Sequence, residues 1–164
     1  MLMADIQSSH DNRSLNINKV GIRNVKIPII IEGKNNHSTV GNISMYVNLP
    51  KNIKGTHMSR FLEILNQYRS CALNYDMIDS ILSKIQSTLD AKKAFIEIEF
   101  PIFIEKTAPS SKKKSIMDYS CKFIASKNKN KFELTTKIAV PINTVCPCSK
   151  AISKEGAHNQ RGIV

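Results

Sequence analysis

The sequence contains no tryptophan, and aromatic residues make up only 6% of its 164 residues. No basic stretch carries the interleaved aromatic side chains on which nucleic-acid bases stack, so nucleic acid is not the expected partner. Hydrophobic runs are short, and none reaches the roughly 18 residues that indicate a transmembrane helix. Residues 1–3 lead directly into polar residues, which is not the pattern of a signal peptide. These absences predict a cytoplasmic protein with no membrane partner.

Cysteine and acidic residues are also scarce. The four cysteines occur in a lysine-rich chain without a signal peptide, which indicates reduced thiols instead of a disulfide framework. Lys and Arg number 24 against 13 Asp and Glu, for a formal net charge of +11. Such a chain can bind nucleic acid, an acidic membrane surface or a phosphorylated metabolite. Of these three partners, a small polyanionic substrate is the simplest explanation of the positive charge.

What the chain does contain is typical of a globular protein. Its apolar content is 41% and its length suffices for an ordinary hydrophobic core. No repeat or flexible linker divides it. We therefore expect an N-terminal arm over residues 1–19 and a single domain over residues 20–164.

Hydrophobic patterning predicts two consecutive helices among several strands. The first helix is expected over residues 56–68, with Met58, Phe61, Leu62 and Leu65 at helical spacing. The second begins at Asp76, its expected N-cap, and ends within residues 90–93. The expected strands are 20–31, 40–49, 94–106, 116–125 and 131–141. This order predicts an α+β fold, an antiparallel sheet with two consecutive helices packed on one face.

Two thiols, an imidazole and two basic side chains lie close together in the last part of the sequence. A proline biases the residue before it towards extended backbone, and residues two apart in an extended segment share a side. Cys146 and Cys148 are therefore expected to face one ion together. With the imidazole of His158 they suit zinc, and they tolerate iron or manganese if a carboxylate joins. Three ligands and one open position is the arrangement of catalytic sites.

Other interpretations of the cysteines remain open at this point. Spacing alone does not separate metal binding from buried structural thiols, which is the interpretation adopted for Cys71 and Cys121. A redox dithiol is disfavoured, because the motif is not C-x-x-C and no clear helix follows it.

A second polar cluster surrounds His57. Hydroxyls, this imidazole and the guanidinium of Arg60 gather where the first helix is expected to begin, and a helix N-terminus can hold a phosphate. The alternative is a capped helix with solvated polar side chains.

Taken in order, several short motifs resemble the type IB GTP cyclohydrolase family, metal-dependent enzymes with a tunnelling fold. The resemblance spans essentially the whole chain, and GTHMSRF and CPCSK…GAHNQR are its specific motifs. The segments are Asp11-Asn12-Arg13, Val20-Gly21-Ile22, Gly55-Thr56-His57-Met58-Ser59-Arg60-Phe61, Ala108-Pro109-Ser110, Cys146-Pro147-Cys148-Ser149-Lys150 and Gly156-Ala157-His158-Asn159-Gln160-Arg161.

The resemblance implies conversion of GTP and water to 7,8-dihydroneopterin triphosphate and formate, by attack of a metal-activated water at C8 of guanine. This reaction begins folate-type pterin biosynthesis and, in many bacteria, queuosine-type biosynthesis. The resemblance also implies zinc or manganese as cofactor and a homo-oligomer with active sites between subunits.

The resemblance assigns roles to three residues by motif position, and residue type together with motif position suggests roles for four more. Cys146 and His158 are the implied metal ligands, with Cys148 as an alternate ligand or redox neighbour. His57 is the candidate proton shuttle, so that Cys146 and His57 are the candidate catalytic residues. The triphosphate is expected to contact Arg60, Lys150 and Arg161.

One departure from the family concerns the end of the sequence at Val164. The family's remaining metal ligands and a purine-anchoring glutamate are expected beyond this position. We therefore expect the N-terminal portion of the enzyme, with a fold incomplete at its C-terminus. The alternatives are a non-catalytic tunnelling-fold subunit and a basic, metal-stabilised nucleic-acid-binding module.

Overall fold

The structure, a computed structural model, describes residues 7, 9–12, 15–152, 154 and 159–164. It divides into two compact units. Unit 1 comprises Met1–Phe100 and Lys122–Thr136, and unit 2 comprises Pro101–Cys121 and Lys137–Val164. A single domain over residues 20–164 stays a prediction.

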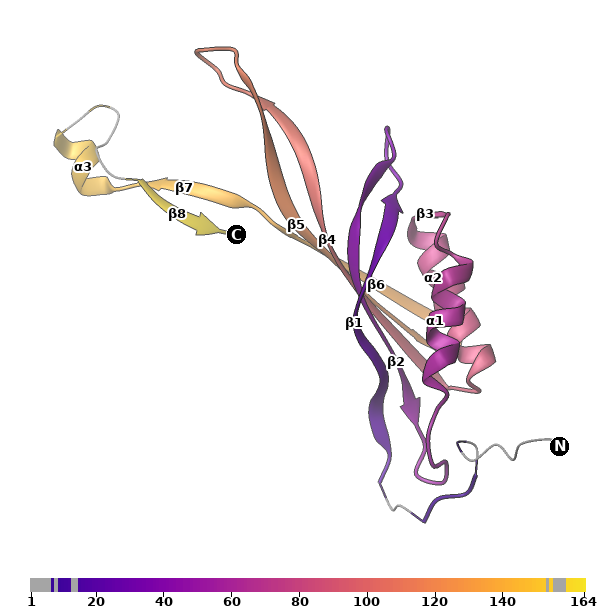
Figure 1. Ribbon diagram of the computed structural model, residues 1–164. Helices are drawn as coiled ribbons and strands as arrows, with labels where there is room; N and C mark the ends of the chain where they lie inside the picture. The colour runs from indigo at the N-terminus through magenta and orange to yellow at the C-terminus, as the bar shows by residue number, and fades with distance from the viewer. Residues whose placement is uncertain (1–6, 8, 13–14, 153, 155–158) are drawn as a thin grey trace. The chain divides into compact units, whose positions relative to one another are not determined.

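Most of the strands belong to one mixed sheet, shown in Figure 1. Its strands are β1 (Ile17–Ile31), β2 (His37–Leu49), β3 (Ala72–Leu73), β4 (Lys93–Thr107), β5 (Lys114–Asn128) and β6 (Lys131–Ala139). Their order is β3-β1-β2-β4-β5-β6. β1 and β4 both pair antiparallel with β2, as predicted. The sheet departs from the predicted antiparallel arrangement at one edge, where the two-residue β3 pairs parallel with β1.

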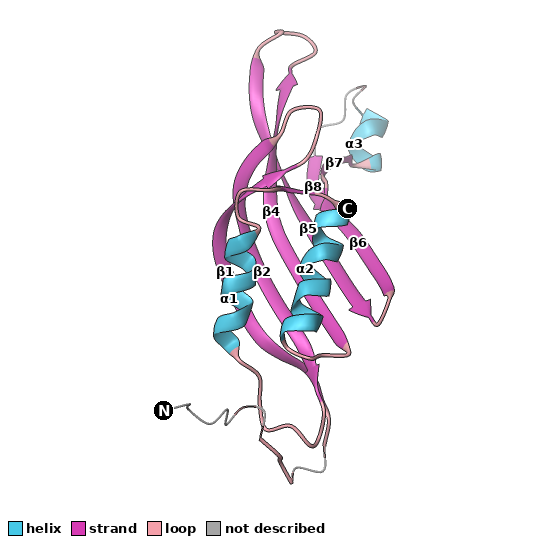
Figure 2. Ribbon diagram, turned by 90° about the vertical axis from the view of Figure 1, so that its right-hand side faces the viewer, coloured by secondary structure: helices cyan, strands magenta, loops and turns pink. Residues whose placement is uncertain are grey.

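Two helices, α1 (Met58–Gln67) and α2 (Tyr75–Thr88), lie side by side on one face of the sheet in unit 1 (Figure 2). They bury an apolar layer against alternate residues of β1, β2 and β4, which is the α+β arrangement predicted. No helix in the described part of the chain is long and apolar enough to span a membrane. The buried helix side chains are Phe61, Ile64, Leu65, Ile78, Ile81, Leu82 and Ile85.

The helix boundaries and faces differ in detail from the prediction. Asn74, not Asp76, caps α2, because its Oδ1 accepts a hydrogen bond of 2.8 Å from the N–H of Met77. Asp76 instead lies in the first turn, where a carboxylate favours the positive end of the helix dipole. In α1, Met58 and Leu62 are exposed, and Ile64, which was not among the residues predicted to be buried, packs beside Phe61 and Leu65 in the buried stripe.

β1 and β2 approach each other unusually closely at Gly21, which pairs with Tyr46. A Cβ atom on Gly21 would lie 2.0 Å from the carbonyl oxygen of Met45 and 2.8 Å from the Cα of Tyr46. The register of the pair shifts on both sides of this point, and Asn24 has a left-handed φ of 58°. Glycine is therefore required at position 21 by backbone packing.

The sheet face opposite the helices carries a network of charges. Glu97 and Glu99 project there, as the alternation of β4 predicts, and the Nζ of Lys122 lies 2.8 Å from a carboxylate oxygen of each. The hydrogen bond from Lys122 lowers the pKa of Glu97, and the bonds to both carboxylates raise the pKa of Lys122. The network keeps this face polar.

An ion pair joins α2 to β5. The Nζ of Lys127 lies 2.7 and 2.9 Å from the two carboxylate oxygens of Asp79 and 2.8 Å from Ser83 Oγ. Replacement of Lys127 by methionine is expected to lower the free energy of unfolding by about 2 kcal/mol, because the half-buried Asp79 loses its partner. Urea denaturation measures this change. Lys131→Met, which breaks the exposed pair with Glu133, should leave the midpoint unchanged; equal effects of both variants would contradict the prediction.

The described residues of unit 2 form hairpins and one short helix. Besides the distal parts of β4 and β5 and the end of β6, it contains β7 (Pro141–Val145), α3 (Pro147–Ile152) and β8 (Asn159–Ile163), none of which was predicted as such. Among the residues that the structure describes, Cys121 is the only buried apolar side chain of this unit. Its large apolar residues that are exposed are Phe103, Ile104, Ile116, Ile138, Val140, Ile152, Ile163 and Val164.

Candidate functional site

The His57 motif is placed by the junction between β2 and α1. His57 has extended backbone angles (φ −79°, ψ 104°) and immediately precedes Met58, so the predicted start of the helix is confirmed. Its carbonyl oxygen accepts a hydrogen bond from the N–H of Arg60 at 3.3 Å. The imidazole is half-buried, with Nε2 shielded from solvent.

A hollow of about 240 Å³ adjoins this junction in unit 1. Thr56, His57 and Arg60 line it, together with residues at the ends of β2 and α2. The guanidinium of Arg60 donates from Nη1 to the carbonyl oxygen of Thr88 at 3.0 Å, which ties the start of α1 to the end of α2. The structure therefore brings His57 and Arg60 to one cavity.

The N-terminal arm braces the loop before His57, a contact that the sequence analysis missed. The backbone N–H groups of Lys54 and Gly55 donate to the carbonyl oxygens of Ser9 and Gln7 at 3.1 and 3.0 Å. Gly55 leaves room for the side chain of Gln7, whose Oε1 would lie 2.0 Å from a Cβ atom at that position. The arm has no hydrophobic periodicity, so the only sign of this contact in the sequence is the glycine at position 55.

Cys146 lies immediately before α3 in unit 2. Its carbonyl oxygen accepts hydrogen bonds from the N–H of Lys150 at 3.1 Å and from the hydroxyl of Ser149 at 3.0 Å. Hydrogen bonds from the backbone N–H of Ser149 and then of Cys148 lower the pKa of the Cys146 thiol. The structure therefore favours the thiolate, which is the form that binds a metal.

The extended segment expected around Pro147 is wrong. Pro147 and Cys148 belong to α3, so the two thiols do not share a side of an extended strand. Proline is well suited to the first helical position, where its missing N–H costs no hydrogen bond. The argument that no helix follows the cysteines is wrong for the same reason. Cys148 is exposed and Cys146 is half-buried.

The other predicted site residues fall into three groups. Lys150 is exposed in the last turn of α3, and Arg161 is exposed in β8, paired with Asn143 of β7. His158 lies outside the described residues. His57 and Arg60 belong to unit 1, whereas Cys146, Cys148, Lys150 and Arg161 belong to unit 2.

The donor chemistry of Cys146 fits a divalent metal, since a thiolate is a preferred zinc ligand. Within the described part of the chain, no group of three or more His, Cys, Asp or Glu side chains converges on one point. The structure therefore supplies one suitable donor, and the pairing of Cys146 with His158 stays a prediction.

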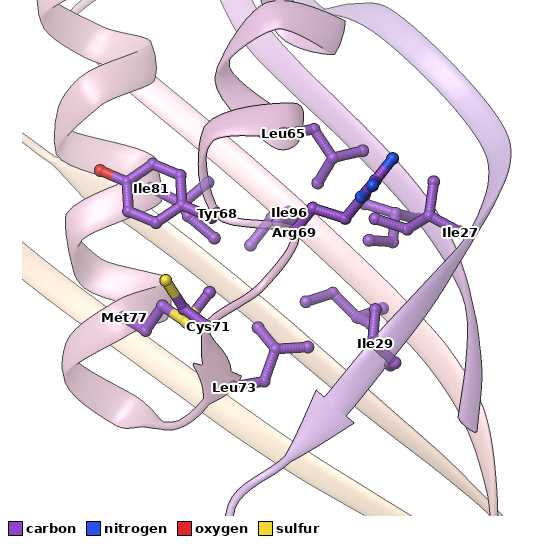
Figure 3. Close-up of a pocket in the computed structure, with 12 residues that line it drawn as sticks. Ile27, Ile29, Leu65, Tyr68, Arg69, Cys71, Leu73, Met77, Ile81 and Ile96 are labelled. Atoms are coloured by element: carbon purple, nitrogen blue, oxygen red, sulfur yellow. The ribbon is translucent and has the colours of Figure 1, made fainter. Parts of the chain in front are cut away.

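A separate apolar crevice lies beneath the connection between α1 and α2, and contains none of the predicted site residues (Figure 3). Leu65, Ile81 and Ile96 point into it, and Met77 and Cys71 lie at its side. Its volume of about 20 Å³ holds roughly one water molecule, which is too little for a substrate. Cys71 is exposed, so its expected burial is wrong, while Cys121 is buried as expected.

The lowered pKa of Cys146 can be tested by alkylation. The rate of its reaction with iodoacetamide should rise with pH around a midpoint lower than that of the same thiol in the unfolded chain, because only the thiolate reacts. Mass spectrometry of a Cys148→Ser variant isolates the signal of Cys146. In urea the backbone hydrogen bonds are lost and the midpoint should return to about 8.5; equal midpoints in the folded and unfolded chain would contradict the assignment.

Comparison with known proteins identifies a sequence family that the chain matches. The sequence model of a family described as type I GTP cyclohydrolase folE2 matches residues 3–164. A protein from Citrifermentans bemidjiense named GTP cyclohydrolase FolE2 is 46% identical over 164 residues, which cover 99% of this chain and 61% of that protein. Proteins of the same name from Geotalea uraniireducens and Syntrophus aciditrophicus are each 48% identical over 99% of this chain, and 60% and 64% of their own lengths are covered. The chain thus spans about three fifths of the length of these curated relatives.

Proposed function

Because the chain belongs to the type I GTP cyclohydrolase folE2 family, we propose that it acts in the conversion of GTP and water to 7,8-dihydroneopterin triphosphate and formate. The observation that carries this proposal is a family match that extends over residues 3–164 and includes both specific motifs. By this proposal the product supplies pterin biosynthesis of the folate type, or a queuosine-type route.

We infer that Cys146 and His158 hold a divalent metal, either zinc or manganese, with iron as a further candidate. The hydrogen bonds that lower the pKa of Cys146 support this role, because they favour the thiolate before any metal binds. Cys146 and His158 would hold the metal, whose chemistry there would be to lower the pKa of a water ligand to about 7 and so to supply hydroxide at neutral pH. Cys148, exposed two residues away, is proposed as an alternate ligand or a redox neighbour.

His57 is proposed to move protons during ring opening and reclosure. An imidazole titrates nearest to neutral pH of all ordinary side chains, which suits a group that gives and takes a proton in one cycle. His57 lines a hollow of about 240 Å³, and this position supports the role. Two backbone hydrogen bonds, from Lys54 and Gly55, join the segment before this imidazole to the N-terminal arm.

Arg60, Lys150 and Arg161 are proposed to bind the triphosphate. Lys150 and Arg161 are exposed, so their charges are accessible to a polyanion. Arg60 uses Nη1 to bind Thr88, and a guanidinium has five N–H donors in all, so it can bind a phosphate oxygen as well.

We further propose the tunnelling fold and a homo-oligomer with active sites between subunits. Two helices on one face of a sheet support the fold. The sheet edges support the oligomer, because β3 pairs with only Ile30 and Ile31 of β1 and β6 is the outer strand at the other side. Unpaired strand edges are the surfaces that add strands from another chain.

The proposal is tested by measuring GTP turnover with added Mn²⁺ or Zn²⁺, with pterin fluorescence read after oxidation. The full-length relative from Geotalea uraniireducens, assayed in parallel, shows that the conditions support the reaction. Metal-dependent product from this chain supports the proposal. An active relative and an inactive chain would contradict it, and would favour a non-catalytic subunit or a metal-stabilised binding module.

A further inference from the structure

Two aromatic rings lie next to each other on the sheet face that the helices leave open. Tyr46 of β2 and Phe95 of β4 are paired residues in the sheet of unit 1. The Nζ of Lys19 lies 4.9 Å from the centroid of the Phe95 ring and 5.4 Å from that of Tyr46. The ammonium of Lys19, on β1, therefore lies over both rings, the position in which an aromatic face attracts a cation. A planar ligand that stacks on Phe95 has to displace this side chain.

Phe95 forms the aromatic wall of a hollow of about 500 Å³ in unit 1. This volume is within the range of sites for small molecules. Ile17 and Pro50 add further apolar surface, and the polar part of the lining comes from Lys92, Lys93 and the amides of Asn16, Asn18 and Asn48. The Oδ1 of Asn48 accepts a hydrogen bond of 2.6 Å from the backbone N–H of Lys93, which fixes this part of the rim.

Lys92 and Lys93, at the rim of the hollow, differ from nearby lysines in their ion pairs with carboxylates. Lys19 and Lys127 lie within 3.5 Å of carboxylates of Glu97 and Asp79. Among the residues that the structure describes, neither Lys92 nor Lys93 has a carboxylate partner within ion-pair distance. Both are exposed, and their charges are therefore available to an anion.

We propose that this hollow binds a planar aromatic ring that carries phosphate groups, with the ring stacked on Phe95 and the phosphates beside Lys92 and Lys93. Stacking on an aromatic side chain tolerates many rings, because every base has a π face. Lys19 leaves the face of Phe95 when the ring binds, and Glu97, 3.5 Å from its Nζ, retains it nearby. A nucleoside triphosphate has the required chemistry, and binding needs neither a metal nor the reaction proposed above.

The residues of this site come from three segments. Asn18 lies near the start of β1 and Asn48 near the end of β2, whereas Lys92 lies in the turn before β4, and Lys93 and Phe95 belong to β4. The sequence shows the two lysines and the phenylalanine together, but it does not show that the two amides join them.

The test measures the binding of ATP, adenosine and inorganic triphosphate by calorimetry, in EDTA so that metal-dependent turnover does not contribute. ATP should bind at least about 5-fold more tightly than either fragment, because it alone contacts ring and lysines together. Phe95→Leu should weaken ATP by at least about 5-fold and leave inorganic triphosphate unchanged. Lys93→Gln should weaken ATP and triphosphate alike by about 3-fold or more.

Lys34→Gln is the matched control, since it removes the same charge from an exposed turn elsewhere in unit 1 and should change nothing. Equal affinities for ATP and inorganic triphosphate would overturn the proposal, as would equal losses in Lys93→Gln and Lys34→Gln. If Phe95→Leu does not fold by thermal melting, the comparison of the two lysine variants decides. Because no GTP turnover is measured, these outcomes are independent of the proposed reaction.

Discussion

Replacement of Cys146 by alanine is expected to lower metal-dependent GTP turnover by at least about 100-fold. Loss of a residue that only hydrogen-bonds to a metal ligand already costs about 10–100-fold, and loss of the ligand itself should cost more. The thiolate at this position is favoured by two backbone N–H groups, and alanine has no atom that replaces the sulfur as a donor. Turnover by pterin fluorescence and metal content by mass spectrometry should fall together. Activity within a few-fold of the parent chain would contradict the assignment of Cys146 as a ligand.

Two further cysteine variants separate a specific effect from a general one. Cys71→Ala changes an exposed thiol of unit 1 and should leave turnover and metal content unchanged. Cys148→Ala distinguishes the two roles proposed for that residue. A loss of metal indicates an alternate ligand, whereas unchanged metal with altered sensitivity to oxidants indicates a redox neighbour.

Replacement of Gly21 by alanine is expected to lower the free energy of unfolding by about 3 kcal/mol, an overpacking effect at the upper end of its usual range. The new Cβ would lie 2.0 Å from the Met45 carbonyl oxygen, which is backbone and cannot rotate away. The strands β1 and β2 would have to move apart at this point, next to the buried apolar layer. For a chain of this length the expected loss corresponds to a fall in Tm of about 6–12 °C, measured by calorimetry.

Gly33→Ala is the control within the same hairpin. Its Cβ would lie 3.3 Å from the carbonyl oxygen of Asn35, in an exposed turn that can move by a few tenths of an ångström. The change in stability should stay within about 0.5 kcal/mol, as for most surface substitutions. If both variants melt at the same temperature, the close approach at Gly21 does not constrain the fold.

Periodic segments were the part of the fold that could be predicted from sequence. The alternation in β4 correctly separates Ile96 and Ile98, which are buried, from Glu97, because a strand packed on one face imposes a period of two. The second helix was also found from its spacing, but its cap was assigned to Asp76. Asn74 and Asp76 are both good caps, and tertiary structure selects Asn74, whose Nδ2 donates to the carboxylate of Glu32.

The candidate site was less accessible to sequence reasoning. Pro147 favours extended backbone before it and helix after it, so the same residue supports both an extended segment and the start of α3. In this structure the helix forms. Ser149 is only 3% exposed, and its hydroxyl donates a hydrogen bond to the carbonyl oxygen of Cys146. The bracing of Gly55 by Gln7 depends on backbone hydrogen bonds, which side-chain patterns do not record.

The scarcity of buried apolar residues in unit 2 has a consequence for colloidal behaviour. Side chains such as Ile116, at 73% exposure, and Ile163, at 76%, offer surface on which molecules of the chain can adhere. The net charge of +11 opposes that adhesion through long-range repulsion between copies. Salt shortens the range of this repulsion to about 8 Å at physiological ionic strength and about 3 Å at 1 M, without weakening apolar attraction. The chain should therefore remain dispersed most readily in dilute buffer, and polyanions that neutralise its lysines should promote precipitation.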